Sequence, residues 1–297
     1  MKKYLKKTAA LLLAALLLTT LLSSAAAADT GPKPSVRISF TGQLKQVCYS
    51  TLLSKSDTAG PAQAWDGVSD DHPQPGETDY EIWRAFAEYR DTDGFRFLQL
   101  WWQVSPDEGL DWTYFPPTTF KLLLYFPETG AFMVSGVYEA YAFDSYFTAY
   151  IQPSDSLSPA QAPITLQKSY DHTWELLSLA CRIVMTVAVE IAVALLFGLR
   201  GRRLLWLIAG VNLATQAALN VALNIVNYRS GSWAFLFYFV ILELAVLLAE
   251  AVLYAALLPK ISGGSVSRRR AVVYAAIANL CSAAGGLLLA KVLPGVF

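Results

Sequence analysis

Four long apolar segments after residue 173 limit the folds open to this chain more than any other feature. They cover about 176–199, 204–228, 233–258 and 271–293, and each is long enough to cross roughly 30 Å of hydrocarbon as a helix. None has the short alternating pattern of a membrane β-barrel strand. The sequence therefore predicts a four-span transmembrane helical domain at 174–297.

Basic residues between these segments predict their orientation. Three arginines lie at 200–203, and a lysine and three arginines lie at 259–270, whereas the connection at 229–232 holds a single arginine. Positive charge marks cytosolic loops, so 200–203 and 259–270 are expected in the cytosol. Residue 173, the 229–232 turn and the C-terminus are then expected outside the cell.

Residues 1–28 have the pattern of a cleavable signal peptide. Four lysines precede an apolar run at 8–22, and small residues at 23–28 end in Ala26-Ala27-Ala28 before Asp29. An uncleaved N-terminal anchor is the alternative interpretation. In either case the segment that follows is predicted to be exported.

Charge is divided unequally between the two parts of the mature chain. Residues 29–173 hold 19 acids and 9 bases, a net charge of −10, while 174–297 hold 4 acids and 10 bases, a net charge of +6. Nucleic acid and anionic lipid both require a basic surface, so neither is expected to bind the exported part. Cys48 is the only cysteine in that part and lies in an apolar run, so we interpret it as a buried small hydrophobic residue rather than an exposed thiol.

Short β-rich runs separated by turn signals predict an extracytoplasmic β domain at 29–152, followed by a linker at 153–173. About seven strands favour a β-sandwich, which makes the whole chain α+β. Residues 56–80 are expected to form a long surface loop. The segment 83–90 is read as the first arm of a hairpin, with a short helix as the alternative. The expected strands are 36–40, 47–53, 83–90, 95–103, 120–126, 131–135 and 145–151.

The exported part is rich in aromatic residues, which can present large rigid faces to a carbohydrate or a peptide. Trp101, Trp102, Trp112 and Tyr114 are the candidate ligand surface. The alternative is that most aromatic residues fill the core of a β domain. Neighbouring side chains of a strand point to opposite faces, so Trp101 and Trp102 cannot both point inward from one strand.

No catalytic set is apparent in the sequence. Asp70, Asp71 and His72 lack a second group of metal ligands. Residues 91–94 are interpreted as a turn, because a calcium loop around them would have Tyr89 at position one and Leu100 at position twelve, which leaves its oxygen cage incomplete. Nucleophile-elbow, phosphate-loop and dinucleotide-binding motifs are absent from the sequence. We therefore expect a non-enzymatic protein with no catalytic residues, no bound metal and no cofactor.

Polar side chains recur inside the predicted spans. Counted from the predicted cytosolic ends, Glu190, Asn212, Glu250 and Asn279 lie at nearly the same depth. Carboxyls at bilayer depth are costly and normally face the interior of a bundle, so we expect a buried layer with at least one neutral glutamate. The predicted layer consists of Glu190, Asn212, Gln216, Asn220, Glu243, Glu250 and Asn279.

Three roles remain open for this layer: holding the helices together, conducting ions or protons, and relaying a signal. Arg182 is expected to extend toward the outer membrane surface, as long basic side chains do near a boundary. Gly285 and Gly286 permit close helix approach.

The run Thr118-Thr119-Phe120-Lys121-Leu122-Leu123-Leu124-Tyr125-Phe126-Pro127-Glu128-Thr129-Gly130 is followed by Tyr141-Ala142-Phe143-Asp144-Ser145-Tyr146-Phe147. Together with the amides at 212–220 and the glutamates at 243 and 250, these stretches resemble a family of uncharacterised exported multi-span membrane proteins of clostridial bacteria. The resemblance implies a Gram-positive cell-envelope protein and assigns no catalytic residues.

We therefore predict a multi-pass protein of the cell membrane, with its β domain and C-terminus extracytoplasmic. The β domain is expected to bind a partner or ligand, either another envelope protein or a second copy of the chain. A small transporter or channel subunit that uses the intramembrane Glu/Asn layer is the alternative. The lipid bilayer and such a partner are the expected partners, and no binding of nucleic acid is expected.

Overall fold

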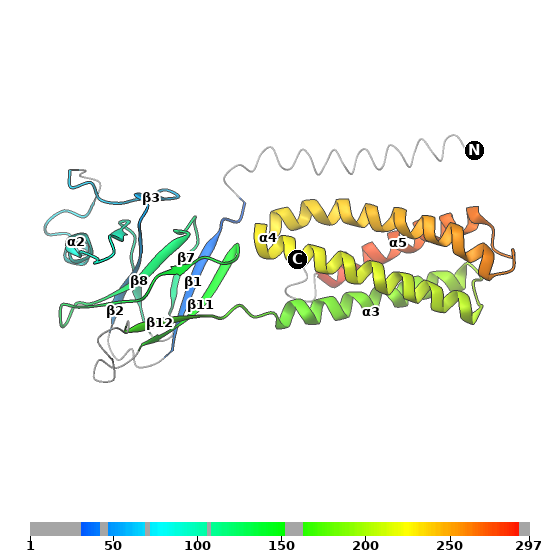
Figure 1. Cartoon of the computed structure of the whole chain (residues 1–297), viewed down its shortest axis with the longest axis horizontal. Coiled ribbons are helices and arrows are strands. Elements are labelled where there is room, and N and C mark those ends of the chain that lie inside the picture. The colour runs from blue at the N-terminus through cyan, green and yellow to red at the C-terminus, as the bar shows by residue number, and fades with distance from the viewer. Residues whose placement is uncertain (1–30, 42–46, 69–71, 106–107, 152–162, 291–297) are drawn as a thin grey trace. The chain divides into compact units, whose positions relative to one another are not determined.

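A computed structural model describes residues 31–41, 47–68, 72–105, 108–151 and 163–290 (Figure 1). The predicted signal peptide lies outside these residues. The chain is mixed α+β, with a sheet-rich N-terminal region followed by helices, as the sequence predicted at this coarse level. It divides into two compact units. We call Lys33–Asp171 the sheet unit, and the helices after His172 the helical unit.

The sheet unit contains a four-stranded sheet in the order β12-β11-β1-β7 and a six-stranded sheet built on the order β10-β8-β2-β5. In the latter, β6 also pairs with β2 and β9 with β8, while β3 and β4 form a separate hairpin. β1 and β11 run parallel, and the other strand pairs are antiparallel. The strands are β1 (Ser35–Thr41), β2 (Cys48–Ser54), β3 (Thr58–Ala59), β4 (Ala62–Gln63), β5 (Arg96–Phe97), β6 (Trp102–Val104), β7 (Leu110–Trp112), β8 (Thr119–Phe126), β9 (Ala131–Val134), β10 (Tyr138–Glu139), β11 (Asp144–Ile151) and β12 (Ile164–Lys168).

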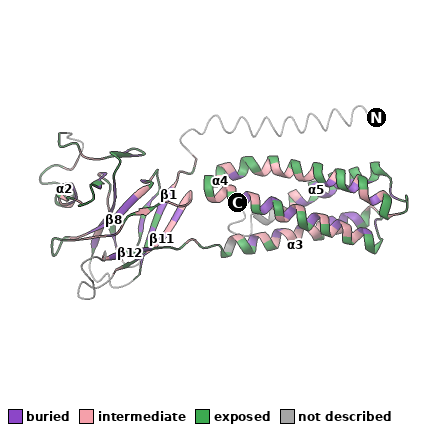
Figure 2. Ribbon diagram, viewed as in Figure 1, coloured by how far each residue is buried: buried purple, intermediate pink, exposed green. Residues whose placement is uncertain are grey.

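The two larger sheets share one hydrophobic core. Alternate residues of β1, among them Val36 and Ile38, meet alternate residues of β8, among them Leu122 and Leu124, because successive side chains of a strand point to opposite faces. β8 is buried over most of its length (Figure 2). Cys48 belongs to this core, and its burial raises the pKa of the thiol to about 12. The interpretation of Cys48 as a buried apolar residue is therefore confirmed.

The other face of the six-stranded sheet is covered by α2 (Tyr80–Glu88). Trp83, Phe86 and Ala87 are buried at the i, i+3 and i+4 positions of that helix. The expectation of a strand at 83–90 was therefore wrong, and the helical alternative is the one that forms. The helical spacing of the apolar residues in this segment was the signal in its favour.

Strand β12 corrects the predicted linker at 153–173. Its five residues pair antiparallel with β11, from Phe147↔Lys168 to Ile151↔Ile164. Ile164 and Leu166 point into the shared core. The alternation of apolar and polar residues in 164–168 is the signal for this strand, although the stretch before it is rich in proline and serine. The sheet unit consequently extends beyond the predicted boundary at 152.

A buried ion pair fixes the turn between α2 and β5. Lys121 on β8 places Nζ 2.8 Å from Asp91 Oδ1 and 2.5 Å from Asp93 Oδ2, and Asp91 Oδ2 accepts the backbone N–H groups of Asp93 and Phe95. Burial by itself would raise the pKa of the Asp91 carboxyl, but the Lys121 and backbone hydrogen bonds outweigh it and hold that pKa below its usual range. The interpretation of 91–94 as a turn is confirmed.

The helical unit consists of α3 (Thr173–Leu196), α4 (Arg202–Ile261) and α5 (Arg268–Ala290), which contact one another pairwise. α4 is interrupted at Gly231, whose φ of 78° and ψ of 179° are not helical. Each half of α4 is about 44 Å long at 1.5 Å per residue. The break falls in the predicted 229–232 connection.

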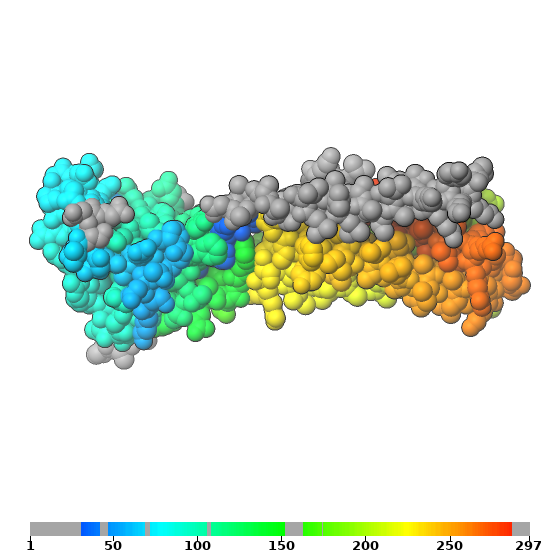
Figure 3. Space-filling view, turned by 90° about the horizontal axis from the view of Figure 1, so that it is seen from above, coloured from blue at the N-terminus to red at the C-terminus, as the bar shows by residue number. Residues whose placement is uncertain are grey.

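Two helices of the described chain, α3 from Glu175 to Leu196 and α4, are long and apolar enough to cross a membrane. Their outward surfaces are strongly apolar: Leu196, Trp206 and Val252 are each more than two thirds exposed. The second half of α4, yellow to orange in Figure 3, forms much of the visible face of the helical unit. Exposed apolar area of this extent is unusual for a surface in contact with water.

The neighbouring glycines of α5 differ in how closely another helix approaches them. A Cβ atom at Gly285 would lie 2.8 Å from Met185 Sδ, whereas one at Gly286 would lie 4.0 Å from Met185 Cε, an ordinary contact. We expect Gly285→Ala to displace the flexible Met185 side chain and to destabilise the unit by about 1 kcal/mol. Gly286→Ala introduces no such clash, so it should lower the unfolding temperature in detergent by clearly less than Gly285→Ala does. Equal effects of the two substitutions would contradict this packing.

Candidate functional site

The helical unit buries a cluster of polar groups around two glutamates. Glu190 of α3 is fully buried, and its Oε2 accepts hydrogen bonds from the hydroxyls of Tyr254 and Tyr274, at 3.3 and 3.1 Å. The Tyr274 hydroxyl also lies 3.2 Å from the Glu190 main-chain oxygen. The two tyrosines come from the second half of α4 and from α5, so Glu190 connects three helical segments.

Glu250 is the second centre of this cluster. It is fully buried, its Oε1 accepts a 2.6 Å hydrogen bond from the Thr215 hydroxyl, and its Oε2 accepts a 2.7 Å bond from Asn279 Nδ2. Its carboxyl also lies next to that of Glu190. Asn279 is oriented by a second bond from the same nitrogen to the Ala275 oxygen. The carboxyls of α3 and α4 therefore meet at one level, together with donors from α4 and α5.

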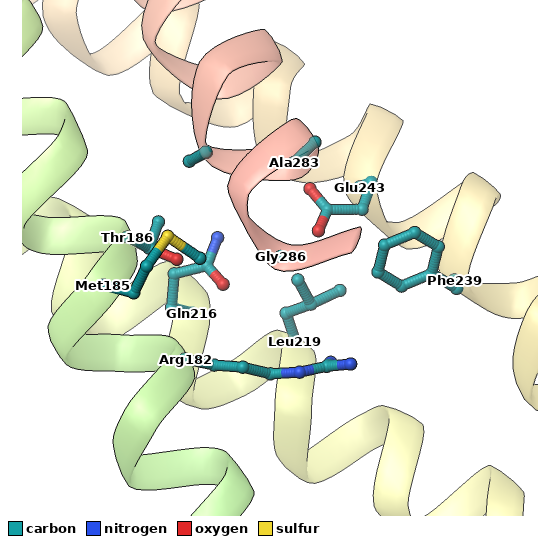
Figure 4. Close-up of a pocket in the computed structure, with 10 residues that line it drawn as sticks. Arg182, Met185, Thr186, Gln216, Leu219, Phe239, Glu243, Ala283 and Gly286 are labelled. Carbon is teal, nitrogen blue, oxygen red and sulfur yellow. The ribbon is translucent and has the colours of Figure 1, made fainter. Parts of the chain in front are cut away.

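A second cluster of polar side chains lies nearer the start of α3 than the first. Arg182 Nη1 donates to Asn220 Oδ1 at 3.2 Å, and Asn220 Nδ2 donates to the Gln216 main-chain oxygen at 2.8 Å. Arg182 and Glu243 reach toward one cavity from different helices (Figure 4). Arg182 is buried, so the expectation that it extends toward the membrane surface was wrong: Asn220 and Glu243 draw the guanidinium into the interior.

The structure thus divides the predicted polar layer into two groups. Glu190, Glu250 and Asn279 gather with Asn212, which is fully buried beside Glu190 but has no well-oriented hydrogen bond from its amide. Gln216, Asn220 and the half-buried Glu243 gather with Arg182. Sequence reasoning missed Thr215, Tyr254 and Tyr274. Counted from the predicted cytosolic ends, Tyr254 and Tyr274 lie about one helical turn nearer the cytosol than the glutamates, so depth did not indicate them.

The predicted ligand surface of the sheet unit does not form as one surface. Trp112 is only 1% exposed and packs in the shared core, with Trp102 against it at a ring-centroid distance of 5.3 Å. Trp101 packs on the opposite face of the sheet, against Phe97. The two neighbouring tryptophans therefore point to opposite faces, as the strand geometry required, and both serve mainly packing.

Tyr114 remains at the surface and gains a neighbour that the sequence did not single out. Tyr114 and Phe115 are each 40% exposed, and their rings meet edge to face at 5.1 Å. Lys33 Nζ lies 5.7 Å from the centroid of each ring, within cation–π range. Together, Tyr114 and Phe115 form what we call the aromatic pair.

The backbone of the aromatic pair is held in a costly conformation. Phe115 has a φ of 46°, in the left-handed region that bulky residues rarely adopt. The β3–β4 hairpin packs against it so closely that a Cβ at Gly60 would lie 2.7 Å from the Phe115 Cβ. Gln99, with a φ of 59°, holds the same hairpin through a 3.2 Å bond from Nε2 to the Gln63 oxygen. Such conformations cost about 1–3 kcal/mol each and gather at functional sites.

His72 lies in an aromatic cluster rather than among other metal ligands. Its ring stacks on Trp83 with centroids 3.9 Å apart, and Trp65 meets both rings edge-on. Asp70 and Asp71 lie outside the described residues. Within the part of the chain that the structure describes, no group of three or more His, Cys, Asp or Glu side chains could hold a metal ion.

Comparison of the chain with protein-family models, with curated proteins and with solved structures finds no match.

Proposed function

We propose that the chain is an integral membrane protein of the bacterial cell envelope that crosses the membrane four times. The sheet unit, the turn at Gly231 and the C-terminus lie outside the cell, and the loops at 200–203 and 259–270 lie in the cytosol. The apolar outward surfaces of α3 and α4 support the membrane location. The arginines of both loops, which are exposed, support the orientation.

We further propose that the sheet unit binds another envelope protein through the aromatic pair, without enzymatic activity. The observation that carries this proposal is the left-handed Phe115, which stands beside an equally exposed Tyr114. Aromatic side chains dominate the binding energy of many protein interfaces, and a fixed backbone reduces the entropy lost on binding. The net charge of −10 at residues 29–173 favours a partner with a basic surface.

Cysteine-directed cross-linking in intact cells tests both parts of the proposal. We expect Thr113→Cys, at an exposed position next to the intact aromatic pair, to react with a membrane-impermeant maleimide cross-linker and to form one discrete larger species. Tyr150→Cys is the matched control, because Tyr150 is 41% exposed but lies on β11. It should react without forming that species. Ser265→Cys, in the 259–270 loop, should react only after the membrane is permeabilised.

Each outcome bears on a different part of the proposal. Reaction of Ser265→Cys in intact cells would show that the 259–270 loop lies outside the cell, opposite to the proposed orientation. Equal cross-linking from positions 113 and 150 would rule out the aromatic pair as the contact site, even if the orientation is as proposed. A species of twice the protomer mass would identify a second copy of the chain as the partner.

A small transporter or channel subunit is the second proposal, and it depends on the contact between Glu190 and Glu250. A proton path through these carboxyls requires a titratable group at position 250, whereas helix packing requires only its shape and hydrogen bonds. The substitution of Glu250 by glutamine, argued in the Discussion, separates these two roles.

A further inference from the structure

A small cavity lies among all three helices of the helical unit. Its volume is about 20 Å³, and its polar lining comes from Arg182, Thr186, Gln216, Glu243 and Ser282. A buried water needs roughly 10–15 Å³ and two to four polar partners. The cavity therefore has the size for one water molecule and more than enough polar groups to hold it.

The lining also has the right mixture of donors and acceptors. The Arg182 guanidinium carries only N–H donors, and the Glu243 carboxylate can only accept. The two groups lie on α3 and on the second half of α4, and they interact electrostatically. Figure 4 shows the Arg182 side chain extending across the cavity below Glu243. Their opposite charges leave the cavity close to neutral, which suits water better than an ion.

We propose that this cavity is a binding site for a single water molecule that joins Arg182 to Glu243. The water accepts a hydrogen bond from the guanidinium and donates one to the carboxylate. The two charges then form a water-mediated pair that links α3 to the second half of α4. The inference goes beyond the proposed function, because it concerns the interior of the helical unit and does not depend on any partner.

Radiolytic labelling of the full-length protein in lipid nanodiscs tests the water site. Met185 lines the cavity, and its thioether is readily oxidised by hydroxyl radicals formed at an adjacent water. We expect X-ray pulses to oxidise Met185 even when a scavenger removes radicals from bulk solvent. Met133, half-buried on β9 of the sheet unit, is the internal control, and the scavenger should suppress its oxidation.

A cavity-filling variant makes the test specific. Gly286 lines the cavity, and a methyl group there makes only an ordinary contact with Met185. We expect Gly286→Ala to reduce the scavenger-resistant oxidation of Met185 at least fivefold. Gly210→Ala, a glycine of α4 with open space around it, should leave that oxidation unchanged. Full suppression by scavenger in the unmodified protein, or no effect of Gly286→Ala, would overturn the water site.

The charge pair is tested separately by a double-mutant cycle. Glu243→Gln leaves a buried guanidinium facing the cavity, and Arg182→Gln leaves a carboxylate there. We expect each single variant to unfold several degrees lower than the unmodified protein, and the double variant to lose clearly less than the sum of the two. Additive losses would overturn the electrostatic link while leaving the labelling result as independent support for the water.

Discussion

Replacing Lys121 by methionine is expected to destabilise the sheet unit by about 3–5 kcal/mol, the usual cost of breaking a buried ion pair from one side. The Lys121 side chain is 5% exposed and that of Asp91 is 1% exposed, so the substitution leaves a carboxylate with almost no access to water. Methionine fills a similar volume, which separates the loss of charge from the loss of packing. Tryptophan fluorescence during urea unfolding measures the change, because five of the eight tryptophans lie in the sheet unit.

The control is Arg84→Met on α2. Arg84 pairs with Glu88 across an exposed helix surface, and surface pairs of this kind contribute little. We expect the urea midpoint of Arg84→Met to equal that of the unmodified protein. A midpoint for Lys121→Met that equals the one for Arg84→Met would show that the buried pair does not stabilise the fold.

The same pair has a defined pH dependence. The pKa of Asp91 is lower in the folded protein than in the unfolded chain, so its contribution is fully present above the unfolded value of about 3.9. That contribution is lost as the pH falls toward the lower folded value. The unmodified protein should therefore lose more stability between pH 5 and pH 2 than Lys121→Met does.

Replacing Glu250 by alanine is expected to destabilise the helical unit by roughly 2–4 kcal/mol, because it leaves a cavity and unpaired donors. The hydroxyl of Thr215 and the amide of Asn279 both lose their acceptor. Glu250→Gln keeps the shape and one oxygen, and the Thr215 hydroxyl can accept from the new amide. We expect this variant to unfold within about 1 kcal/mol of the unmodified protein.

Thermal unfolding in detergent, followed by circular dichroism, measures these effects. Leu248→Ala, an exposed position on the same helix, serves as the control and should have little effect. If Glu250→Gln is as damaging as Glu250→Ala, a packing role for this carboxyl is contradicted. If Glu250→Gln folds stably but abolishes a proton flux measured in liposomes, the transport alternative is supported, because a packing role alone does not predict the loss of flux.

Part of the sheet unit could be predicted from local sequence. Alternation at 36–40 and the turn at 127–130 gave β1 and the β8–β9 hairpin, because one face of each strand is buried. The segment at 83–90 was more difficult, since its apolar residues also fit a strand. Its helical form depends on packing against the face of a sheet that only distant segments create.

The candidate sites, like the sheet unit, could be predicted only in part. The depth of Glu190 and Glu250 followed from counting residues along each span, and both are buried together. The rotation of each helix about its axis is not encoded in that count, so Tyr254 and Tyr274 could not be chosen as their partners. Trp112 illustrates a different difficulty. The aromatic composition of its segment suggested a ligand surface, but the sequence does not distinguish a tryptophan in the core from one at the surface.

The parallel pairing of β1 with β11 affects the order in which the chain can fold during its synthesis. Ser35 pairs with Asp144, so the two strands are separated by more than a hundred residues, and β7 on the other side of β1 is also distant. Closing such long loops costs entropy before any contact repays it. In the proposed topology the chain emerges outside the membrane from its N-terminus, so the edge of β1 that pairs with β11 stays unsatisfied until nearly the whole sheet unit has emerged.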